Sequence, residues 1–339
     1  NQSNDHNLSD STRGAAKQIR PNRDIAEVSA SDQIKSFTST GFTVGTSGDS
    51  NRAGNTYVAW CWKVGGGTTS SNTDGSGITS TVQSNADTGI SIVKWTGTAN
   101  ASHTVGHGLG TTPDVIMLKD YSNTRNWMVH VSAAPTVNQP FGGNLDLNTT
   151  FNTNAGTNGG FGTPTSSVIT FTNGSGSVNN MNASSANIIA YCFSAVSGFS
   201  HFGSYPGNGS NDGPFIETGF EPAFLMIKRT DSTGSWFIYD SHRNTSDPRT
   251  KYVQANTSNV EASDLIGVDF LSNGFKLLDD YSHLNADGGE YVYMAFAADP
   301  DTTTPTLTNS FNAIRYRGNG SGLPVSGLGF KPDFIWAKA

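Results

Sequence analysis

The amino-acid sequence predicts an all-β protein made of three tandem antiparallel β-sandwich-like modules, one of which is split between the N- and C-termini. Short runs rich in Val, Ile, Thr and aromatic residues alternate with Gly, Asn and Ser, which is typical of strands joined by turns. Aromatic residues make up 10% of the 339 residues, so the chain has the large apolar side chains that disordered proteins lack. A propeller-like closed repeat is the alternative architecture.

Three copies of one series of blocks indicate the tandem modules. In each copy a strand-like block ends in a lysine, at Lys119, Lys228 and Lys338, which gives a period of about 110 residues. Each copy also has an aromatic-rich closing strand, which in the copy split between the chain ends covers residues 57–62. Because this strand is apolar on both faces, we expect it to lie in a sandwich interior or at a contact between modules.

The repeat register divides the chain into complete and incomplete modules. Stretches rich in Gly, Ser, Thr or Pro predict linkers, and one stretch rich in Asn, Gly and Thr predicts a surface excursion. The predicted parts are the second half of the split module at 1–64, a linker at 65–90, a module at 91–196 with an insertion at about 135–165, a module at 197–299, a linker at 300–310 and the first half of the split module at 311–339.

The two ends of the chain match the two halves of one module. Residues 8–13 match residues 238–243, and placing residue 1 after Ala339 leaves a register mismatch of one residue. Neither half is expected to fold alone, because each would expose apolar strand faces and unpaired backbone edges. The halves must therefore pair, either within one chain or between neighbouring chains.

Charge, apolar runs and cysteines limit the setting and the partners. The formal net charge is −7 without a basic stripe, so no nucleic-acid partner is expected. The sequence has no run of 18 apolar residues, so no membrane insertion is expected. The chain begins without Met, and we expect a piece of a longer protein. Cys61 and Cys192 fill one slot in different copies, so we expect them to be buried and not bridged.

No catalytic, cofactor or metal site is predicted, so we expect a protein that is not an enzyme. The sequence has no Gly-x-Ser-x-Gly elbow and no phosphate loop. His103 and His107 lie in a Gly-rich turn and lack the adjacent Glu of a helical zinc site. Residues 208–213 offer oxygens for Ca²⁺ but have no acidic residue at the far end, so a tight hairpin turn is preferred. A pair of carboxylates for glycan cleavage is not identifiable.

An Asp–Arg pair recurs in two copies, as Asp10 with Arg13 and as Asp240 with Arg243. Such a pair could bind a sugar or a carboxylate. The alternative is a purely structural role, as a local ion pair or a turn in which Asp accepts backbone N–H bonds. Because repeated positions usually serve the shared fold, we prefer the local ion pair.

One slot of the opening strand is aromatic in all three copies. If the rings are exposed, they could form a platform that binds carbohydrate. A repeated aromatic position is more often part of a core. We therefore prefer core packing for the three residues, which are Trp95, Tyr205 and Tyr316.

The repeated blocks resemble a module of virion structural and tail-fibre-like proteins of marine tailed phages. The resemblance covers nearly the whole chain, is weakest over 135–165, and supplies no catalytic residue. It implies a non-enzymatic structural protein of a phage virion appendage, located in the virion or extracellular, with copies of itself, other virion proteins or a host-surface glycan as partners. An extracellular carbohydrate-binding or adhesion module is the alternative. The matching blocks are residues 10–14, 34–37, 41–45, 57–63, 105–110, 236–241 and 270–275.

The resemblance also bears on the split module. Because such virion parts are elongated, we expect its halves to pair between subunits of an oligomer, or in a continuous array, slightly more than within one chain.

Overall fold

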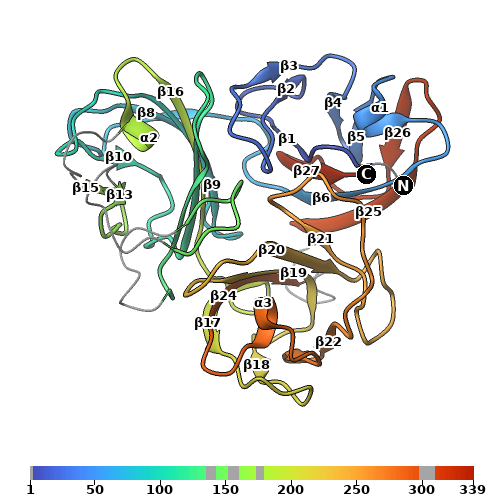
Figure 1. Cartoon of the computed structure of the whole chain (residues 1–339). Helices are drawn as coiled ribbons and strands as arrows, with labels where there is room; N and C mark the ends of the chain where they lie inside the picture. The colour runs from blue at the N-terminus through green and yellow to red at the C-terminus, as the bar shows by residue number, and fades with distance from the viewer. Residues whose placement is uncertain (1–2, 135–142, 152–159, 173–178, 298–309) are drawn as a thin grey trace.

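The computed structural model describes residues 3–134, 143–151, 160–172, 179–297 and 310–339. These residues form antiparallel strands joined by short turns, so the predicted all-β class is confirmed. Figure 1 shows three groups of sheets around a common centre. The α-helices of this part of the chain have four residues each and are α1 (Gly48–Asn51), α2 (Asn179–Asn182) and α3 (Ser282–Asn285).

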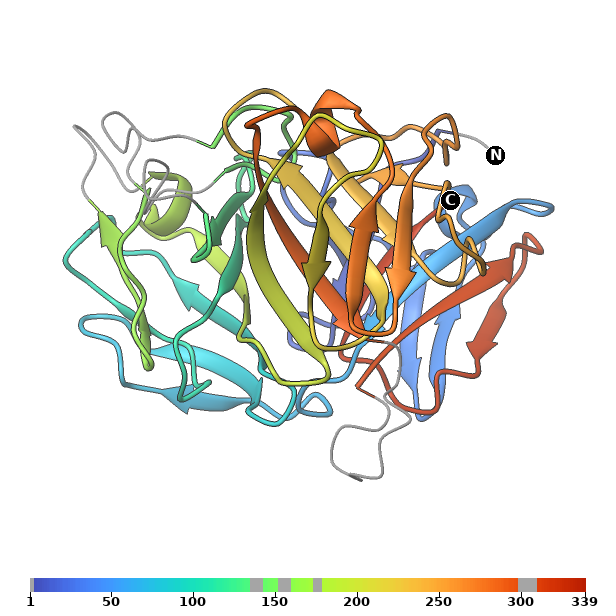
Figure 2. The same ribbon diagram turned by 90° about the horizontal axis from the view of Figure 1, so that it is seen from below.

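One sheet, which we call the terminal sheet, takes its strands from both ends of the chain. β27 (Phe334–Lys338) lies between β1 (Asn7–Asp10) and β6 (Thr56–Trp62), and β25 (Phe311–Arg317) forms the edge beyond β6. The two halves therefore pair within one chain, and the expected pairing between chains is wrong. The physical reason is that the two ends lie side by side, close enough to share ladder hydrogen bonds (Figures 1 and 2).

The other two large sheets are continuous in sequence. The second sheet has the order β12-β11-β16-β9-β8-β7, and the third sheet has the order β17-β24-β19-β20-β21. Their strands are β7 (Ser70–Asn72), β8 (Ser80–Asn85), β9 (Ile90–Thr96), β11 (Val115–Asp120), β12 (Met128–Val131), β16 (Asn187–Phe193), β17 (Ser200–Pro206), β19 (Pro222–Arg229), β20 (Trp236–Asp240), β21 (Val253–Gln254) and β24 (Glu290–Ala297).

The stretch 65–90 is not the linker that its composition predicted, because it contributes β7 and β8 to the second sheet. β7 is an edge strand whose residues are exposed or half-buried, so polar Ser and Asn can occupy it. The second predicted linker, 300–310, lies outside the described residues except for Ser310.

Small sheets accompany the large ones. Phe37 and Phe42 lie opposite each other in a hairpin formed by β4 and β5. The orders are β26-β5-β4, β18-β23-β22, β10-β14, β13-β15 and β2-β3, with bounds β2 (Lys17–Gln18), β3 (Val28–Ser29), β4 (Ile34–Thr38), β5 (Gly41–Val44), β10 (Val105–Gly106), β13 (Gly160–Phe161), β14 (Val168–Ile169), β15 (Phe171–Thr172), β18 (Phe215–Glu217), β22 (Val268–Leu271), β23 (Gly274–Leu277) and β26 (Leu323–Ser326).

Alternation along the closing strands connects two kinds of core. In β6, Trp60 and Trp62 point into a central core shared by all three large sheets, whereas Ala59 and Cys61 point into a separate core beneath β4 and β5. β16 and β24 divide their side chains in the same way. The prediction that the 57–62 strand is buried on both faces is confirmed, because one face packs within its own group of sheets and the other contacts the neighbouring groups.

The central core is dominated by aromatic rings. Trp62 lies 4.8 Å from Phe334 and 5.5 Å from Phe296, measured between ring centroids, so it joins the terminal sheet to the third sheet. Tyr191 of the second sheet lies 4.7 Å from Phe334. Such aromatic pairs contribute about 0.5–1.5 kcal/mol each beyond their burial, which makes this cluster a strong contact between the sheets.

Part of the predicted insertion is not a surface excursion. Residues 135–142 and 152–159 lie outside the described residues, but residues 143–151 pack into the molecule, with Leu145 and Phe151 buried in the central core. The Phe151 N–H donates to the Thr230 carbonyl oxygen at 2.9 Å. Leu145 and Phe151 are apolar residues within a stretch that is otherwise polar, and their burial packs the segment against the central core.

Candidate functional site

The repeated Asp–Arg pairs are local ion pairs that close the turns after β1 and β20. Asp10 and Arg13 are 2.6 Å apart, and Asp240 and Arg243 are 2.5 Å apart, between carboxylate oxygen and Nε. Each carboxylate also accepts the backbone N–H of its own arginine, at 2.8 Å and 2.7 Å. Both aspartates are fully buried. This geometry supports the preferred interpretation, in which the repeated pair serves the fold.

Each of these aspartates also accepts a hydrogen bond from a side chain of a neighbouring sheet, which the sequence did not reveal. Tyr191 of the second sheet donates its hydroxyl to Asp10 at 2.7 Å, and Trp60 Nε1 donates to Asp240 at 3.2 Å. At the boundary between the second and third sheets, the corresponding residues are Val131 and Met294, which line one small apolar space. The two boundaries of the terminal sheet therefore carry a hydrogen-bonded pair at this position, and the boundary between the second and third sheets carries an apolar pair.

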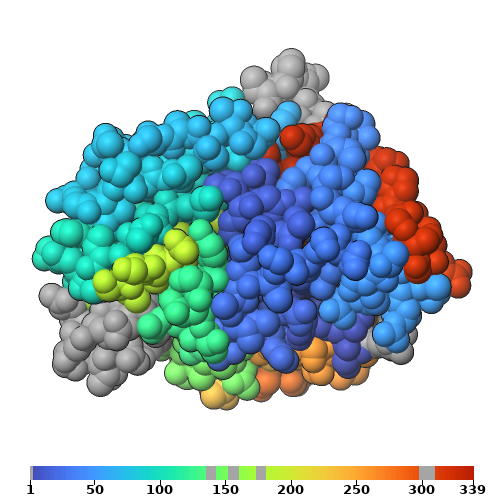
Figure 3. All heavy atoms as spheres, turned by 90° about the horizontal axis from the view of Figure 1, so that it is seen from above, coloured from blue at the N-terminus to red at the C-terminus, as the bar shows by residue number. Residues whose placement is uncertain are grey.

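A tryptophan ring nitrogen crosses two of the boundaries between the large sheets. Trp127 Nε1 donates to the Arg20 carbonyl oxygen at 2.9 Å, which joins the second sheet to the N-terminal segment. Trp236 Nε1 donates to the Asn144 carbonyl oxygen at 2.9 Å, which joins the third sheet to the second region. Figure 3 shows the N-terminal segment (dark blue) directly against the green segments of the second region.

At the boundary between the terminal and third sheets, His6 occupies the repeat position that holds Trp127 and Trp236 in the other two copies. Its Nε2 lies 3.0 Å from the Gln254 carbonyl oxygen, and its Nδ1 accepts a hydrogen bond from Trp336 at 2.9 Å. Burial holds the pKa of His6 well below its usual value, so the ring is neutral and donates from Nε2. We call these three ring-to-carbonyl hydrogen bonds the boundary contacts. They form a closed ring around the central core.

The three lysines that mark the repeat period are buried. Lys119 donates to the Asp24 carbonyl oxygen at 2.7 Å, and Lys338 donates to the Ser258 carbonyl oxygen at 3.0 Å, so both cross a boundary. Lys228 donates to the carbonyl oxygen of the residue that follows it, at 2.5 Å. Burial lowers the pKa of Lys119 to about 8, that of Lys228 to about 7 and that of Lys338 to about 8. The ammonium groups of Lys119 and Lys338 therefore connect neighbouring groups of sheets, whereas that of Lys228 binds within its own strand.

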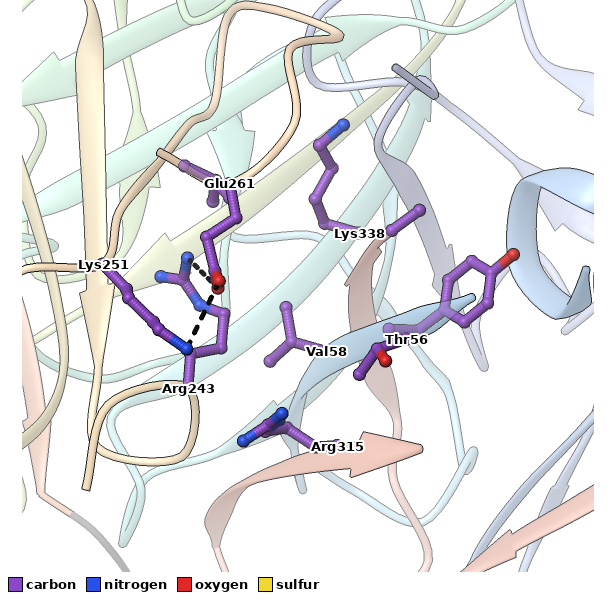
Figure 4. Close-up of a pocket in the computed structure, with 10 residues that line it drawn as sticks. Thr56, Val58, Arg243, Lys251, Glu261, Arg315 and Lys338 are labelled. Carbon is purple, nitrogen blue, oxygen red and sulfur yellow. Dashed lines mark ion pairs between the residues drawn. The ribbon is translucent and has the colours of Figure 1, made fainter. Parts of the chain in front are cut away.

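A cavity of about 220 Å³ opens between the terminal and third sheets (Figure 4). Four cationic side chains and one carboxylate contribute to its lining, in a protein whose net charge is negative. The lining residues are Thr56, Tyr57, Val58, Arg243, Lys251, Val253, Glu261, Arg315, Lys338 and Ala339. This cavity is the candidate binding site.

The carboxylate of Glu261 stands between two of these cations. Its oxygens lie 3.5 Å from Arg243 Nη1 and 3.7 Å from Lys251 Nζ, as the dashed lines in Figure 4 mark. Arg243 is buried, and its Nη2 donates to the Ile238 carbonyl oxygen at 2.8 Å. Its Nη1 has no hydrogen-bond partner among the described residues. Arg315 is exposed at the rim, with one long hydrogen bond of 3.4 Å to a backbone carbonyl.

The boundary between the terminal and second sheets carries a matching set of residues, beside a space of about 260 Å³ that Lys94 and Tyr121 help to line. Glu27 lies 3.1 Å from Arg13 Nη1 and 3.3 Å from Lys17 Nζ, so both contacts are shorter than those of Glu261. Tyr121 follows Lys119 by two residues and packs against the central core. Its carbonyl oxygen accepts the Glu27 N–H at 2.8 Å. In the cavity, Ala339 is the residue after the corresponding lysine.

The other sequence candidates are used within the fold. His103 Nδ1 lies 2.9 Å from Thr98 Oγ1, and His107 is buried with Nε2 3.1 Å from the Thr165 carbonyl oxygen. The residues described in the structure contain no group of three or more His, Cys, Asp or Glu side chains that could hold a metal ion. The predicted core role of the repeated aromatic slot holds for Trp95 and Tyr205, which are buried, while Tyr316 is half-buried.

A buried asparagine ends each of the three short helices, and the sequence patterns described above did not identify it. Asn51, Asn182 and Asn285 are fully buried, and each holds the turn after an opening strand. Asn285 accepts the Asn208 N–H at 2.8 Å and so fixes the turn at 208–213. The recurrence of Asn in three equivalent positions was the available signal.

The comparison with known families classifies the chain. Residues 1–300 match the family described as a domain of unknown function, DUF7483. The chain belongs to this family. No curated protein and no solved structure matches this DUF7483 chain. Among its described residues, no helix is both long enough and apolar enough to cross a membrane.

Proposed function

We propose that this DUF7483 chain is a non-enzymatic structural component of a phage virion appendage, such as a tail fibre. The observation that carries the proposal is the closed ring of boundary contacts around one central core. Each group of sheets holds the next one, so none can separate without breaking contacts at two boundaries. A compact ring of this kind suits a building block of an assembly outside the cell.

The proposed building block consists of three tandem β-sandwich-like modules. Three separate cores, each beneath one large sheet, support this division. In the terminal region the small sheet β26-β5-β4 supplies the opposite layer, and in the third region β18-β23-β22 does so. The alternation of side chains in β6 supports a sandwich whose outer face contributes to a shared core.

Immuno-electron microscopy tests the virion role. Gold-labelled antibodies raised against residues 1–339 should decorate an appendage of phage particles from the source sample, and pre-immune serum should not. Labelling of cells with no labelling of any particle would contradict the proposal.

An adhesion module that binds carbohydrate is the second candidate. The cavity between the terminal and third sheets favours it, because ligand sites are typically concave and carry a few polar groups that orient the ligand. A glycan array separates the candidates, since several chemically related hits would favour adhesion and a blank array would favour the structural role alone.

A further inference from the structure

We propose that the boundary between the terminal and third sheets opens in mild acid through protonation of His6, while the other two boundaries stay closed. Its boundary contact is made by a histidine, whereas tryptophans make the other two. A tryptophan ring keeps one N–H at every pH, but a histidine ring gains a second N–H at about pH 6.5. Of the three boundary contacts, one therefore changes with pH.

Both ring nitrogens of His6 are in use, and they have opposite roles. Nδ1 lies 2.9 Å from the indole nitrogen of Trp336, which can only donate, so Nδ1 is the acceptor. The proton of the neutral ring is therefore on Nε2, which donates to the Gln254 carbonyl oxygen at 3.0 Å. A second proton on Nδ1 would face the Trp336 N–H and would break this hydrogen bond inside a fully buried site.

The cations around His6 also oppose its protonation. Lys338 lies on the adjacent strand, and its ammonium group donates to the carbonyl oxygens of Asn4 and Ser258. Arg243 is buried on the other side of the boundary. Burial, and then the charges of Lys338 and Arg243, hold the pKa of His6 well below its usual value. The ring therefore takes up a second proton more readily when the boundary is open than when it is closed.

The carboxylates at this boundary are engaged by other cations. The ion pairs are Asp5 with Arg20, Asp240 with Arg243, and Glu261 with Lys251. Carboxylates ordinarily take up a proton at about pH 4, which is about two units below the ordinary pKa of histidine. Between about pH 6.5 and 5, the protonation of His6 is therefore separated from the loss of these ion pairs.

The other two copies show the same boundary position without a titratable ring. They combine a tryptophan with a methionine in the same register, as Trp127 with Met117 and Trp236 with Met226. In the terminal sheet these two positions hold a histidine and Trp336. The exchange of a Trp–Met combination for a His–Trp combination introduces an acceptor nitrogen, and this nitrogen stops accepting when it is protonated.

Acid does not weaken the acceptors that hold the two tryptophan backbones. Asp146 accepts the backbone N–H of Trp127 at 2.9 Å, and burial raises the pKa of Asp146 to about 6. Because this value lies above the unfolded value of 3.8, lowering the pH from 7 to 5 favours the folded state at this carboxyl group. Asn256, which does not titrate, accepts the backbone N–H of Trp236 at 3.0 Å. Mild acid therefore acts selectively on the boundary that His6 holds.

Hydrogen exchange of residues 1–339, measured by mass spectrometry at pH 7.5 and 5.5, tests the proposal. In the open boundary the pKa of His6 returns to about 6.5, so the opening constant should rise about tenfold over this range. The amides of 253–258 should lose protection by the same factor, after correction for the direct effect of pH on exchange. Segments 124–131 and 231–236, at the two tryptophan contacts, should keep their protection.

Two variants remove the titratable ring from the boundary. His6→Gln keeps one donor and one acceptor, and His6→Trp combined with Trp336→Met reproduces the other two copies. In both, the protection of 253–258 should change by less than about twofold between the two pH values. His242→Gln is the control, because His242 is a half-buried histidine in the turn beside Arg243, and this variant should respond to acid as the unaltered chain does.

Nitrogen NMR of the imidazole rings in the unaltered chain gives a readout that needs no variant. At pH 5.5 the closed protein should show a proton on Nε2 of His6 and none on Nδ1. The proposal is overturned if His6 becomes protonated near pH 6.5 in the closed protein, or if all three boundaries lose protection equally. It is also overturned if 253–258 keep their protection at pH 5.5, if His6→Gln responds as the unaltered chain does, or if His242→Gln abolishes the response.

Discussion

Lys338 donates a hydrogen bond across the boundary between the terminal and third sheets to the carbonyl oxygen of Ser258, 3.0 Å away. Lys119 makes the same contact with Asp24 at the next boundary, at 2.7 Å. Two of the lysines that define the repeat period in the sequence therefore also connect neighbouring groups of sheets.

Replacing Lys228 with Met should stabilise the protein at pH 7. This buried ammonium makes its hydrogen bond to the adjacent residue, so a Met of similar length removes a buried charge, for a gain of about 1–3 kcal/mol in the free energy of unfolding. Lys338→Met is the matched comparison and should be less stable than Lys228→Met, because it leaves the Ser258 carbonyl oxygen without this donor. Urea denaturation measures both, and equal effects of the two changes would contradict the boundary role.

The three lysines also predict a pH dependence. Their folded-state pKa values of about 7 to 8 lie below the unfolded value of 10.5, so the unfolded chain binds more protons between these values. The free energy of unfolding should therefore rise as the pH increases from about 7 to 9.5. Lys228→Met should flatten this rise. A stability that falls across this window would show that the lysines are not buried as described.

Asp146→Asn should stabilise the protein at neutral pH. Asp146 accepts a hydrogen bond from the backbone N–H of Trp127 at 2.9 Å. At the two matching positions the acceptor is an asparagine: Asn22 accepts the backbone N–H of His6, and Asn256 accepts that of Trp236. Burial raises the pKa of Asp146 to about 6, so its contribution to stability is full below pH 3.8 and is lost as the pH rises through 6. The amide keeps the acceptor, so we expect a gain of about 1 kcal/mol at pH 7 and none at pH 3.5.

Thermal denaturation at both pH values checks the Asp146 prediction. Asn22→Asp is the reciprocal change and should destabilise the protein at pH 7. A gain for Asp146→Asn of equal size at the two pH values would attribute the effect to packing rather than to ionisation.

Asp240→Ala should destabilise the protein by about 3–5 kcal/mol, because it removes the closest and most buried counter-ion of Arg243. The double change Asp240→Leu with Arg243→Met should recover much of this loss. Asp212→Ala removes an exposed carboxylate and serves as the control, with an expected change within about 0.5 kcal/mol. If Asp240→Ala left the melting temperature unchanged while abolishing ligand binding, the local ion-pair interpretation would be wrong.

The thiols of Cys61 and Cys192 should react only after global unfolding. Both are free and fully buried, and burial raises the pKa of Cys192 to about 12 and holds that of Cys61 well above its usual value. A chromogenic disulfide reagent should label neither cysteine in buffer and both in denaturant. Rapid labelling of one thiol in buffer would reveal local opening of its strand.

The repeat pattern predicted more of the architecture than of the contacts within it. It indicated the strands, the split of one module between the ends and the unpaired cysteines, because these follow from apolar alternation and from the register of the copies. It could not place the boundary contacts, since the acceptor of Trp236 is a backbone carbonyl at Asn144, and any residue type supplies a carbonyl. The linker prediction for 65–90 failed because polar edge strands and linkers share the same composition.

The cavity was also beyond the sequence. Arg243 was identified through its repeat, but its Nη1 lies 3.5 Å from Glu261 where Arg13 Nη1 lies 3.1 Å from Glu27, a difference of less than half an ångström. Differences of that size arise from packing and leave no mark on residue types. The repeated Asp–Arg motif therefore predicted the ion pair at both places and the surrounding cavity at neither.

The terminal sheet has a consequence for the newly made polypeptide. β1 and β6 are synthesised well before β27, which lies between them in the sheet. At about 5–20 residues per second, β6 waits roughly 15–50 s for β27. During that time β6 lacks both of its neighbours in the sheet, β25 and β27, so its backbone edges are unpaired and we expect this region to be the one most dependent on a chaperone in the cell.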